Sequence, residues 1–291
     1  MADSNATARA FWQLIEPIHA VAYFAPEPVT ALKYAGYRGF WMGYFAGRAA
    51  PLGPVGPEVV HALFYNFRYD RVARALPAAW EFAPPAAALD ARGRGSVAAL
   101  RRALGTAADG PAVVRAAELA GKAAAAAPIE GRPLFATYRT LPVPADPLAR
   151  LWHAATLLRE HRGDGHVAAL LVAGIGGRES HVLQHLAIGT PRDVYGYARD
   201  YDDAEWEQRL TSLCAKGLVG PVGPGELTAL GVSVKTDIEA STDALAAAAY
   251  ANLTADELAE LVGLLRPITQ AVVRTGDIPL DSPMGLDLRT I

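Results

Sequence analysis

The sequence has 291 residues, of which 52% are hydrophobic and 20% are charged, and its formal net charge at pH 7 is −3. This composition predicts a globular chain with sizeable cores and enough length for two domains. It lacks the overall basic excess that is typical of proteins that bind nucleic acid or anionic membranes. The single cysteine excludes an internal disulfide. With no secretory signal pattern and no apolar run of membrane-spanning length, we expect a cytoplasmic protein without a membrane partner.

Helical periodicity dominates the first part of the chain. Apolar residues recur at helical spacing from Thr7 to Tyr23, and Pro26 and Pro28 end that helix and begin the next. The segment 37–50 is apolar nearly all round, which predicts a buried, central helix. Further helices are expected over residues 58–66, 70–80, 84–104 and 111–127.

Residues 128–146 are expected to link an N-terminal lobe, residues 1–127, to a C-terminal lobe, residues 147–291. Several prolines and Gly131 interrupt any continuous helix in this linker. Within it, the run Leu134-Phe135-Ala136-Thr137-Tyr138 predicts a short strand.

The second lobe is also predicted to be helical. Asp146-Pro147 begins a helix that is expected to end near Glu160, and Arg162-Gly163-Asp164-Gly165 is expected to form a sharp turn because glycine permits tight turns. Asp202 or Asp203 is expected to cap a helix that ends near Lys216. Further helices are expected over residues 165–173, 178–187, 192–199 and 227–249, and after a capping box formed by Thr254 and Glu257.

The sequence pattern predicts that one helical unit occurs twice in the chain. Residues 38–47 followed by 58–63 align with residues 162–171 followed by 180–186, with a two-residue gap in the connection. Two similar lobes create a seam, and pockets usually form at such seams.

The second copy continues into a run of residues with a family resemblance. Glu205-Trp206, Lys216-Gly217-Leu218-Val219, the loop after them, Leu227-Thr228-Ala229-Leu230-Gly231 and the segment 253–257 are similar to the C-terminal half of MarR-type winged-helix proteins. The resemblance covers residues 178–268. It implies a recognition helix that ends near residue 219, a wing over 220–226, and a long helix that makes a homodimer.

The wider chain resembles a group of actinobacterial tandem helix-turn-helix proteins. The resemblance rests on residues 19–24, 38–48, 64–67 and 161–166. It implies an all-α fold with short wing strands, built from two tandem winged-helix-like lobes.

The candidate recognition helix carries the wrong charges for DNA. It begins Asp202-Asp203-Ala204-Glu205-Trp206-Glu207, so four carboxylates would face the phosphate backbone, and the loop 220–226 has no arginine. The same carboxylates also favour a helix N-terminus. Basic residues do occur nearby, at Arg178, Arg192 and Arg199. A MarR-like DNA-binding transcriptional regulator is therefore kept as the second hypothesis.

Histidines are the main chemical resource, and the expected turn would bring His161 and His166 together. In an enzyme, one of them would be the general base, with Asp164 or Glu179 to orient it. Imidazole and carboxylate groups also suit Zn²⁺ or Fe²⁺, so a metal-dependent enzyme is a further alternative. The spacing matches no established metal signature, and no cofactor is identified. The plain alternative is that these residues cap helices.

Aromatic residues crowd the first lobe. The helix expected over 37–50 has more large aromatic side chains than one core stripe can hold, and its glycines recur at every fourth position, which leaves room for a flat ligand. The leading hypothesis is therefore a protein that binds, and in one version transforms, a planar apolar metabolite in a cavity lined by aromatic residues and histidines. Core packing alone, and a scaffold without a site, are the alternatives. The candidate ligand-binding residues are His19, Arg38, Trp41, Tyr44, Phe45, Phe64, Tyr65 and Asn66.

Overall fold

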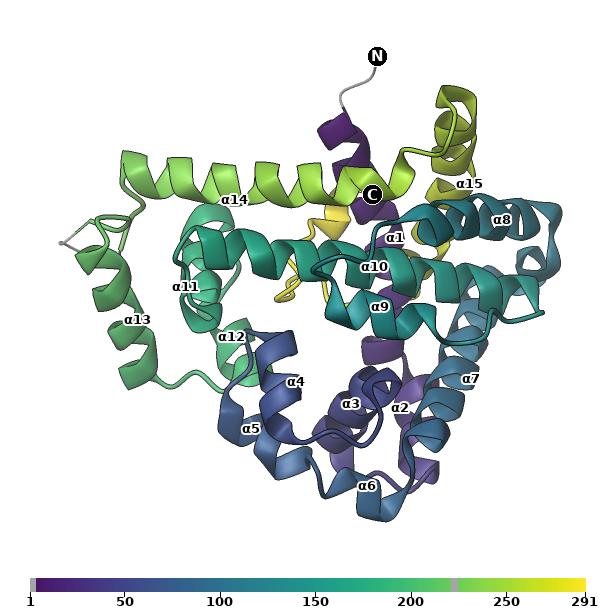
Figure 1. Ribbon diagram of the computed structural model, residues 1–291, viewed down its shortest axis with the longest axis horizontal. Coiled ribbons are helices and arrows are strands. Elements are labelled where there is room, and N and C mark those ends of the chain that lie inside the picture. Colours follow the sequence, from purple (N-terminus) through teal and green to yellow (C-terminus); the bar gives the residue numbers. More distant parts are fainter. Residues whose placement is uncertain (1–3, 221–224) are drawn as a thin grey trace.

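Two long helices run side by side through the molecule, and the N-terminal helix packs against both (Figure 1). These are α10 (Pro147–Val172), α14 (Ala229–Ala247) and α1 (Ser4–Phe24). The structure is a computed structural model that describes residues 4–220 and 225–291.

The remaining helices surround this frame. In Figure 1, α11 to α13 lie at one side of the molecule, and α2 to α7 fill the lower part. The bounds are α2 (Pro26–Tyr34), α3 (Gly39–Ala49), α4 (Pro57–Phe64), α5 (Tyr69–Ala75), α6 (Ala79–Phe82), α7 (Pro85–Leu104), α8 (Pro111–Ala126), α9 (Pro133–Arg139), α11 (Gly177–Ile188), α12 (Arg192–Arg199), α13 (Asp203–Ala215) and α15 (Ala255–Arg274).

Side-chain caps fix the starts of several helices. Asp146 accepts a hydrogen bond from Ala149 N at 2.8 Å, with proline in the first turn of α10. Asp202 caps α13 in the same way, and Thr254 with Glu257 forms the predicted capping box of α15. These three predicted helix starts are confirmed.

Apolar burial divides into two clusters. The main cluster draws on α1, α3, α7, α8, α10 and α15, so it takes residues from both sides of segment 128–146. The second cluster lies between the end of α10 and helices α11, α13 and α14, with Val182, Trp206 and Leu213 almost fully buried. Helix α10 contributes to both, because its first half packs in the main core and Ala169 and Leu170 pack in the second.

The strand prediction for residues 134–138 is wrong. These residues lie in α9, which begins at Pro133, and Leu134, Phe135 and Tyr138 are buried at helical spacing. Apolar residues at positions 134, 135 and 138 fit one face of a helix as well as they fit a short apolar strand.

The turn predicted at residues 162–165 is also wrong, because these residues lie within the continuous helix α10. The glycine at 165 is needed for packing, since an added Cβ would stand 2.7 Å from Nη1 of Arg132 and 3.3 Å from Cβ of Leu245. A glycine in a helix can permit close approach as well as mark a turn.

Two further helices differ from expectation. The helix expected over 70–80 is divided into α5 and α6, with a cis peptide bond between Leu76 and Pro77. The helix expected over 37–50 begins at Gly39 and is not buried all round, because Phe40 is 42% exposed.

The all-α prediction is confirmed. In the described part of the chain, β-pairing is limited to a bridge between Val219 and Leu227 at the base of the expected wing, whose residues 221–224 lie outside the described residues. The tandem winged-helix lobes and the division into 1–127 and 147–291 stay predictions. None of the described helices is long and apolar enough to span a bilayer.

Candidate ligand pocket

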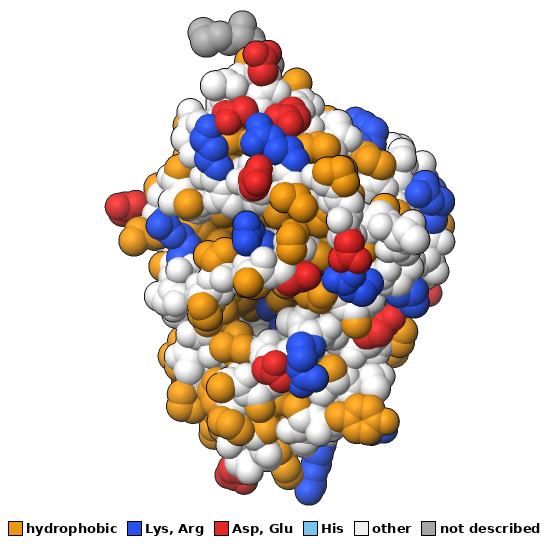
Figure 2. Space-filling view, turned by 90° about the vertical axis from the view of Figure 1, so that its right-hand side faces the viewer, with side chains coloured by type: hydrophobic (Ala, Val, Ile, Leu, Met, Phe, Trp, Pro, Cys, Tyr) orange, Lys and Arg blue, Asp and Glu red, His pale blue; other side chains and the backbone are white. Residues whose placement is uncertain are grey.

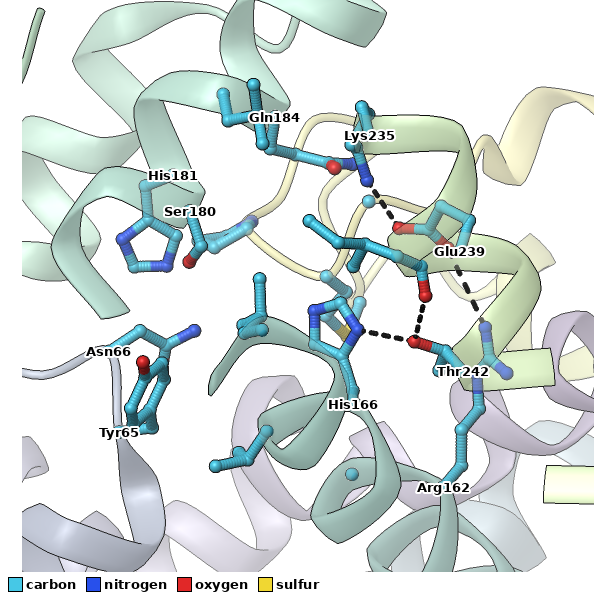
Figure 3. Close-up of a pocket in the computed structure, with 18 of the residues that line it drawn as sticks. Tyr65, Asn66, Arg162, His166, Ser180, His181, Gln184, Lys235, Glu239 and Thr242 are labelled. Atoms are coloured by element: carbon cyan, nitrogen blue, oxygen red, sulfur yellow. Dashed lines mark hydrogen bonds and ion pairs between the residues drawn. The ribbon is translucent and has the colours of Figure 1, made fainter. Parts of the chain in front are cut away.

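A pocket of about 980 Å³ opens between α1, α10, α11 and α14 (Figure 3). The connection between α4 and α5 and the C-terminal tail complete its wall. This volume lies in the range of small-molecule sites in proteins. The pocket is therefore the candidate ligand-binding site.

His166, on α10, presents a hydrogen-bond acceptor to the pocket. Its Nδ1 lies 2.9 Å from Oγ1 of Thr242, and that hydroxyl donates its own proton to the carbonyl of Ile238 at 2.7 Å. Thr242 can therefore only accept from the ring, so His166 carries its proton on Nδ1 and leaves Nε2 free to accept. Burial lowers the pKa of His166 to about 4, which keeps the ring neutral at pH 7. Figure 3 shows its second nitrogen turned away from Thr242, toward the pocket interior.

His181, on α11, has the same arrangement on the opposite wall. The Tyr201 hydroxyl donates to the carbonyl of Arg178 and lies 3.3 Å from Nδ1 of His181, so it accepts the ring proton. Nε2 of His181 is buried and has no hydrogen-bond partner among the described residues. Burial, followed by the charges of Arg199 and Arg178, lowers the pKa of this ring well below its ordinary value. It is a second neutral acceptor.

An ion-pair cluster forms the wall between α1, α10 and α14. Asp243 accepts from Arg9 at 2.8 Å and from Arg162 at 2.7 Å. Glu239 pairs with Arg9 and with Lys235. Burial alone would raise the pKa of Glu239, but Lys235 holds it at about 2. Each of these charges has a partner of opposite sign, and the ion pairs join the three helices to one another.

A second, more deeply buried ion network joins α1, α3 and α10. Glu160 pairs with Arg48 at 3.0 Å and with Arg159 at 2.7 Å, and Arg159 also reaches Glu16 at 3.3 Å. The guanidinium of Arg48 lies over the Phe64 ring, 4.1 Å from its centroid. Burial opposes ionisation of Glu160, yet the two arginines hold its pKa well below the usual range.

Tyr65 and Asn66 enter the wall through the end of α4. Tyr65 has φ +53°, and its hydroxyl donates to the carbonyl of Ile175 at 2.7 Å. Gly177 makes this approach possible, because a Cβ there would lie 2.1 Å from the Tyr65 carbonyl oxygen. The positive φ at Tyr65 is thus held by contact with the start of α11.

The structure places only some of the candidate residues in the pocket. Tyr44, Phe64, Tyr65, Asn66, Asp164 and His166 line it. The others lie elsewhere. Phe45 and His19 are fully buried, Trp41 stacks against Arg71, and Arg38 covers the Phe82 ring at the surface.

The expected cluster of His161, Asp164, His166 and Glu179 does not form as predicted. His161 packs edge-on against Phe135, and neither ring nitrogen has a partner among the residues described. Asp164 accepts from Phe135 N at 2.9 Å. Glu179 caps α11 through Gly176 N and binds Ser212 and Lys216.

The expected convergence of His161 and His166, on which the metal hypothesis depended, is therefore wrong. The two residues are five apart on one continuous helix and face different neighbours, Phe135 and Thr242. No group of three or more metal-ligating side chains is assembled within residues 4–220 and 225–291.

Sequence reasoning missed most of the polar wall. In the sequence, Arg9 is more than two hundred residues away from Lys235 and Glu239, so no local pattern joins it to them. The sequence signal that pointed to this wall was the spacing of Lys235 and Glu239, which are four residues apart on one face of α14.

The expected recognition helix, α13, offers little to phosphate. Three of the cations that flank it already have partners, since Arg178 binds Glu205 at 2.7 Å, Arg192 binds Asp203 at 2.7 Å, and Lys216 binds Glu179. Figure 2 shows basic and acidic side chains interspersed over another face of the molecule. Ion pairs such as Arg115 with Glu260 join α8 to α15.

The chain belongs to a helix-turn-helix family, whose model matches residues 8–279. No curated protein and no solved structure matches the chain. The family match agrees with the helical architecture and with a helix-turn-helix protein.

Proposed function

We propose that this protein binds a small molecule in the pocket between α1, α10, α11 and α14. The observation that supports this most is the pair of neutral histidines, His166 and His181, which both present Nε2 acceptors to one space of about 980 Å³. A buried acceptor without a partner costs free energy that a ligand donor recovers. The ligand is expected to carry N–H or O–H donors and an aromatic or apolar body that packs on Phe64 and Tyr65.

The proposal modifies the earlier hypothesis of a planar apolar metabolite. The pocket wall is both aromatic and strongly polar, with Arg9, Arg162, Glu239 and Asp243 on one side. An entirely apolar ligand would leave the two histidine acceptors without a hydrogen-bond donor. A partly polar ligand fits the wall better.

The test is a screen of a chemically diverse library, with binding detected by thermal shift and measured by calorimetry. A variant whose side chain fills the pocket shows whether the ligands bind there. Val167 lies on the pocket wall in α10, and Val172, on the same helix, is 91% exposed. Val167→Trp is expected to abolish binding, whereas the matched Val172→Trp is expected to leave it unchanged. Binding that survives Val167→Trp would place the ligand elsewhere and refute the proposal.

A DNA-binding regulator is the second candidate, and the family match favours it. The test is fluorescence anisotropy with DNA from upstream of the protein's own gene. Tight binding that falls steeply with salt would support this function, because phosphate contacts release counterions. The ion pairs around α13 make weak, salt-insensitive binding the expected result for that surface.

A homodimer through the C-terminal helices is proposed with either function. Helix α14 leaves Leu230 and Val232 more than half exposed. Light scattering of the purified protein would show the mass of a dimer if this holds, and that of a single chain if it does not.

A further inference from the structure

One cation on the pocket wall lacks the compensation that the others have. Arg199, the last residue of α12, lines the pocket with Tyr44, Arg48 and His181. Within the described residues, Arg199 has no carboxylate in ion-pair contact, whereas Arg48 is held by Glu160 at 3.0 Å. The wall at this end therefore carries an unbalanced positive charge.

The immediate contacts of Arg199 do not neutralise it. Its Nη1 donates to the carbonyl of Ala198 at 2.9 Å, and its guanidinium lies 4.3 Å from the centroid of the Phe67 ring. Its Nε is buried and has no hydrogen-bond partner among residues 4–220 and 225–291. The fork of donors on a guanidinium matches carboxylate, sulfonate or phosphate oxygens.

His181 supplies the complementary group beside Arg199. Its Nδ1 is committed to Tyr201, and its buried Nε2 is an acceptor without a partner in the described structure. The charge of Arg199 helps to keep this ring neutral by lowering its pKa. The guanidinium donors of Arg199 and the imidazole acceptor of His181 thus lie at the same end of the pocket.

We propose that this end of the pocket binds an organic anion, with Arg199 paired to its acidic group and Nε2 of His181 accepting a hydrogen bond from a donor next to that group. The inference rests on the proposed function and assigns the chemical class of its ligand. The acidic group would replace the missing carboxylate, and the aromatic rings of Tyr44 and Phe67 would cover the adjoining apolar part.

The probes are two fluorescent dyes that differ by one group. 8-Anilino-1-naphthalenesulfonate carries a sulfonate with an N–H beside it, and N-phenyl-1-naphthylamine is the same molecule without the sulfonate. Both increase in fluorescence on leaving water. We expect the native protein to bind the sulfonate about tenfold or more tightly than the neutral dye, because hydrogen bonds to charged groups are the stronger ones.

Arg199→Gln is expected to remove this preference and to leave binding of the neutral dye within about twofold, as expected for the loss of a charge-specific contact. Arg199→Lys should restore part of it, because lysine keeps the charge without the fork. The matched control is Arg192→Gln, at the other end of α12, where the arginine pairs with Asp203 outside the pocket. Circular dichroism confirms that each variant is folded, and Val167→Trp must abolish binding of both dyes.

Three outcomes are distinguishable. Loss of the sulfonate preference in Arg199→Gln alone supports the inference. Equal binding of the two dyes, or a preference that Arg199→Gln leaves intact, overturns the anion assignment and leaves the pocket function standing. If neither dye binds the native protein, the anion inference and the proposed function fail together.

Discussion

His161 offers the sharpest test of how burial controls stability in this protein. The side chain is 1% exposed, and neither nitrogen finds a partner among the described residues. Burial, with the charge of Arg132, lowers its pKa from 6.5 to about 3. Replacement by leucine removes a buried polar group that costs about 1–3 kcal/mol, and loses an edge-on ring contact worth about 0.5–1.5 kcal/mol. We therefore expect His161→Leu to equal or exceed the native stability at pH 7 by up to about 2 kcal/mol.

The pH dependence gives the larger signal. Because the folded pKa of His161 lies below the unfolded value, its stability contribution is complete above pH 6.5 and is lost as the pH falls toward about 3. At pH 4 the loss amounts to about 3 kcal/mol, from a shift of some 2.5 pH units at 1.36 kcal/mol per unit. The advantage of His161→Leu should therefore grow by about 3 kcal/mol between pH 7 and pH 4.

The assay is urea unfolding of the native protein, His161→Leu and His161→Gln at pH 7, 5 and 4. Glutamine keeps a polar group but cannot titrate, so it should share the gain at pH 4 without the gain at pH 7. A leucine variant that is less stable than the native protein at pH 7 and equally sensitive to acid would refute the reasoning. That result would mean that the ring nitrogens have partners such as buried water.

Three other predictions concern groups that hold the pocket in place. Burial raises the pKa of Asp164 to about 6, so the folded protein favours the protonated acid and its stability falls as the pH rises from 3.8 through 6. Asp164→Asn should therefore raise the free energy of unfolding by about 3 kcal/mol at pH 8, and urea unfolding that shows no gain would contradict this. Gly177→Ala places a Cβ 2.1 Å from the Tyr65 carbonyl oxygen and should cost about 1–3 kcal/mol in thermal unfolding, unlike Gly121→Ala, where nothing lies within 4 Å. Glu160→Gln leaves the buried Arg48 without a counter-charge and should lower the free energy of unfolding by about 3–5 kcal/mol. A change under about 1 kcal/mol would show that water solvates the guanidinium of Arg48.

Local signals predicted the helices well where caps and periodicity agreed. Asp202 and Thr254 sit at the helix starts where the sequence placed them, because capping depends on residues within one turn. The glycines at 163 and 165 misled the prediction, since the reason for Gly165 is the approach of Arg132, about thirty residues away. Long-range packing of this kind leaves no periodic trace.

The pocket was predictable only in part for the same reason. The aromatic residues Tyr44, Phe64 and Tyr65 were found because they are concentrated in one stretch of sequence. His181 and Arg199 acquire their meaning from partners, or from the lack of them, in the folded chain. Charge balance around a side chain is a property of three-dimensional neighbours, so sequence order alone does not reveal it.

The pocket wall includes Asn5 near one end of the sequence and Gly285 near the other. Its complete outline therefore exists only when widely separated parts of the chain have met, and the entropy of closing that loop has already been lost. Any occupant that binds only this assembled form draws the whole folding equilibrium toward it, by an amount set by its concentration relative to its dissociation constant. Occupancy should consequently register as a rise in the melting temperature of the entire molecule, and protection from proteolysis should extend to helices that never touch the occupant.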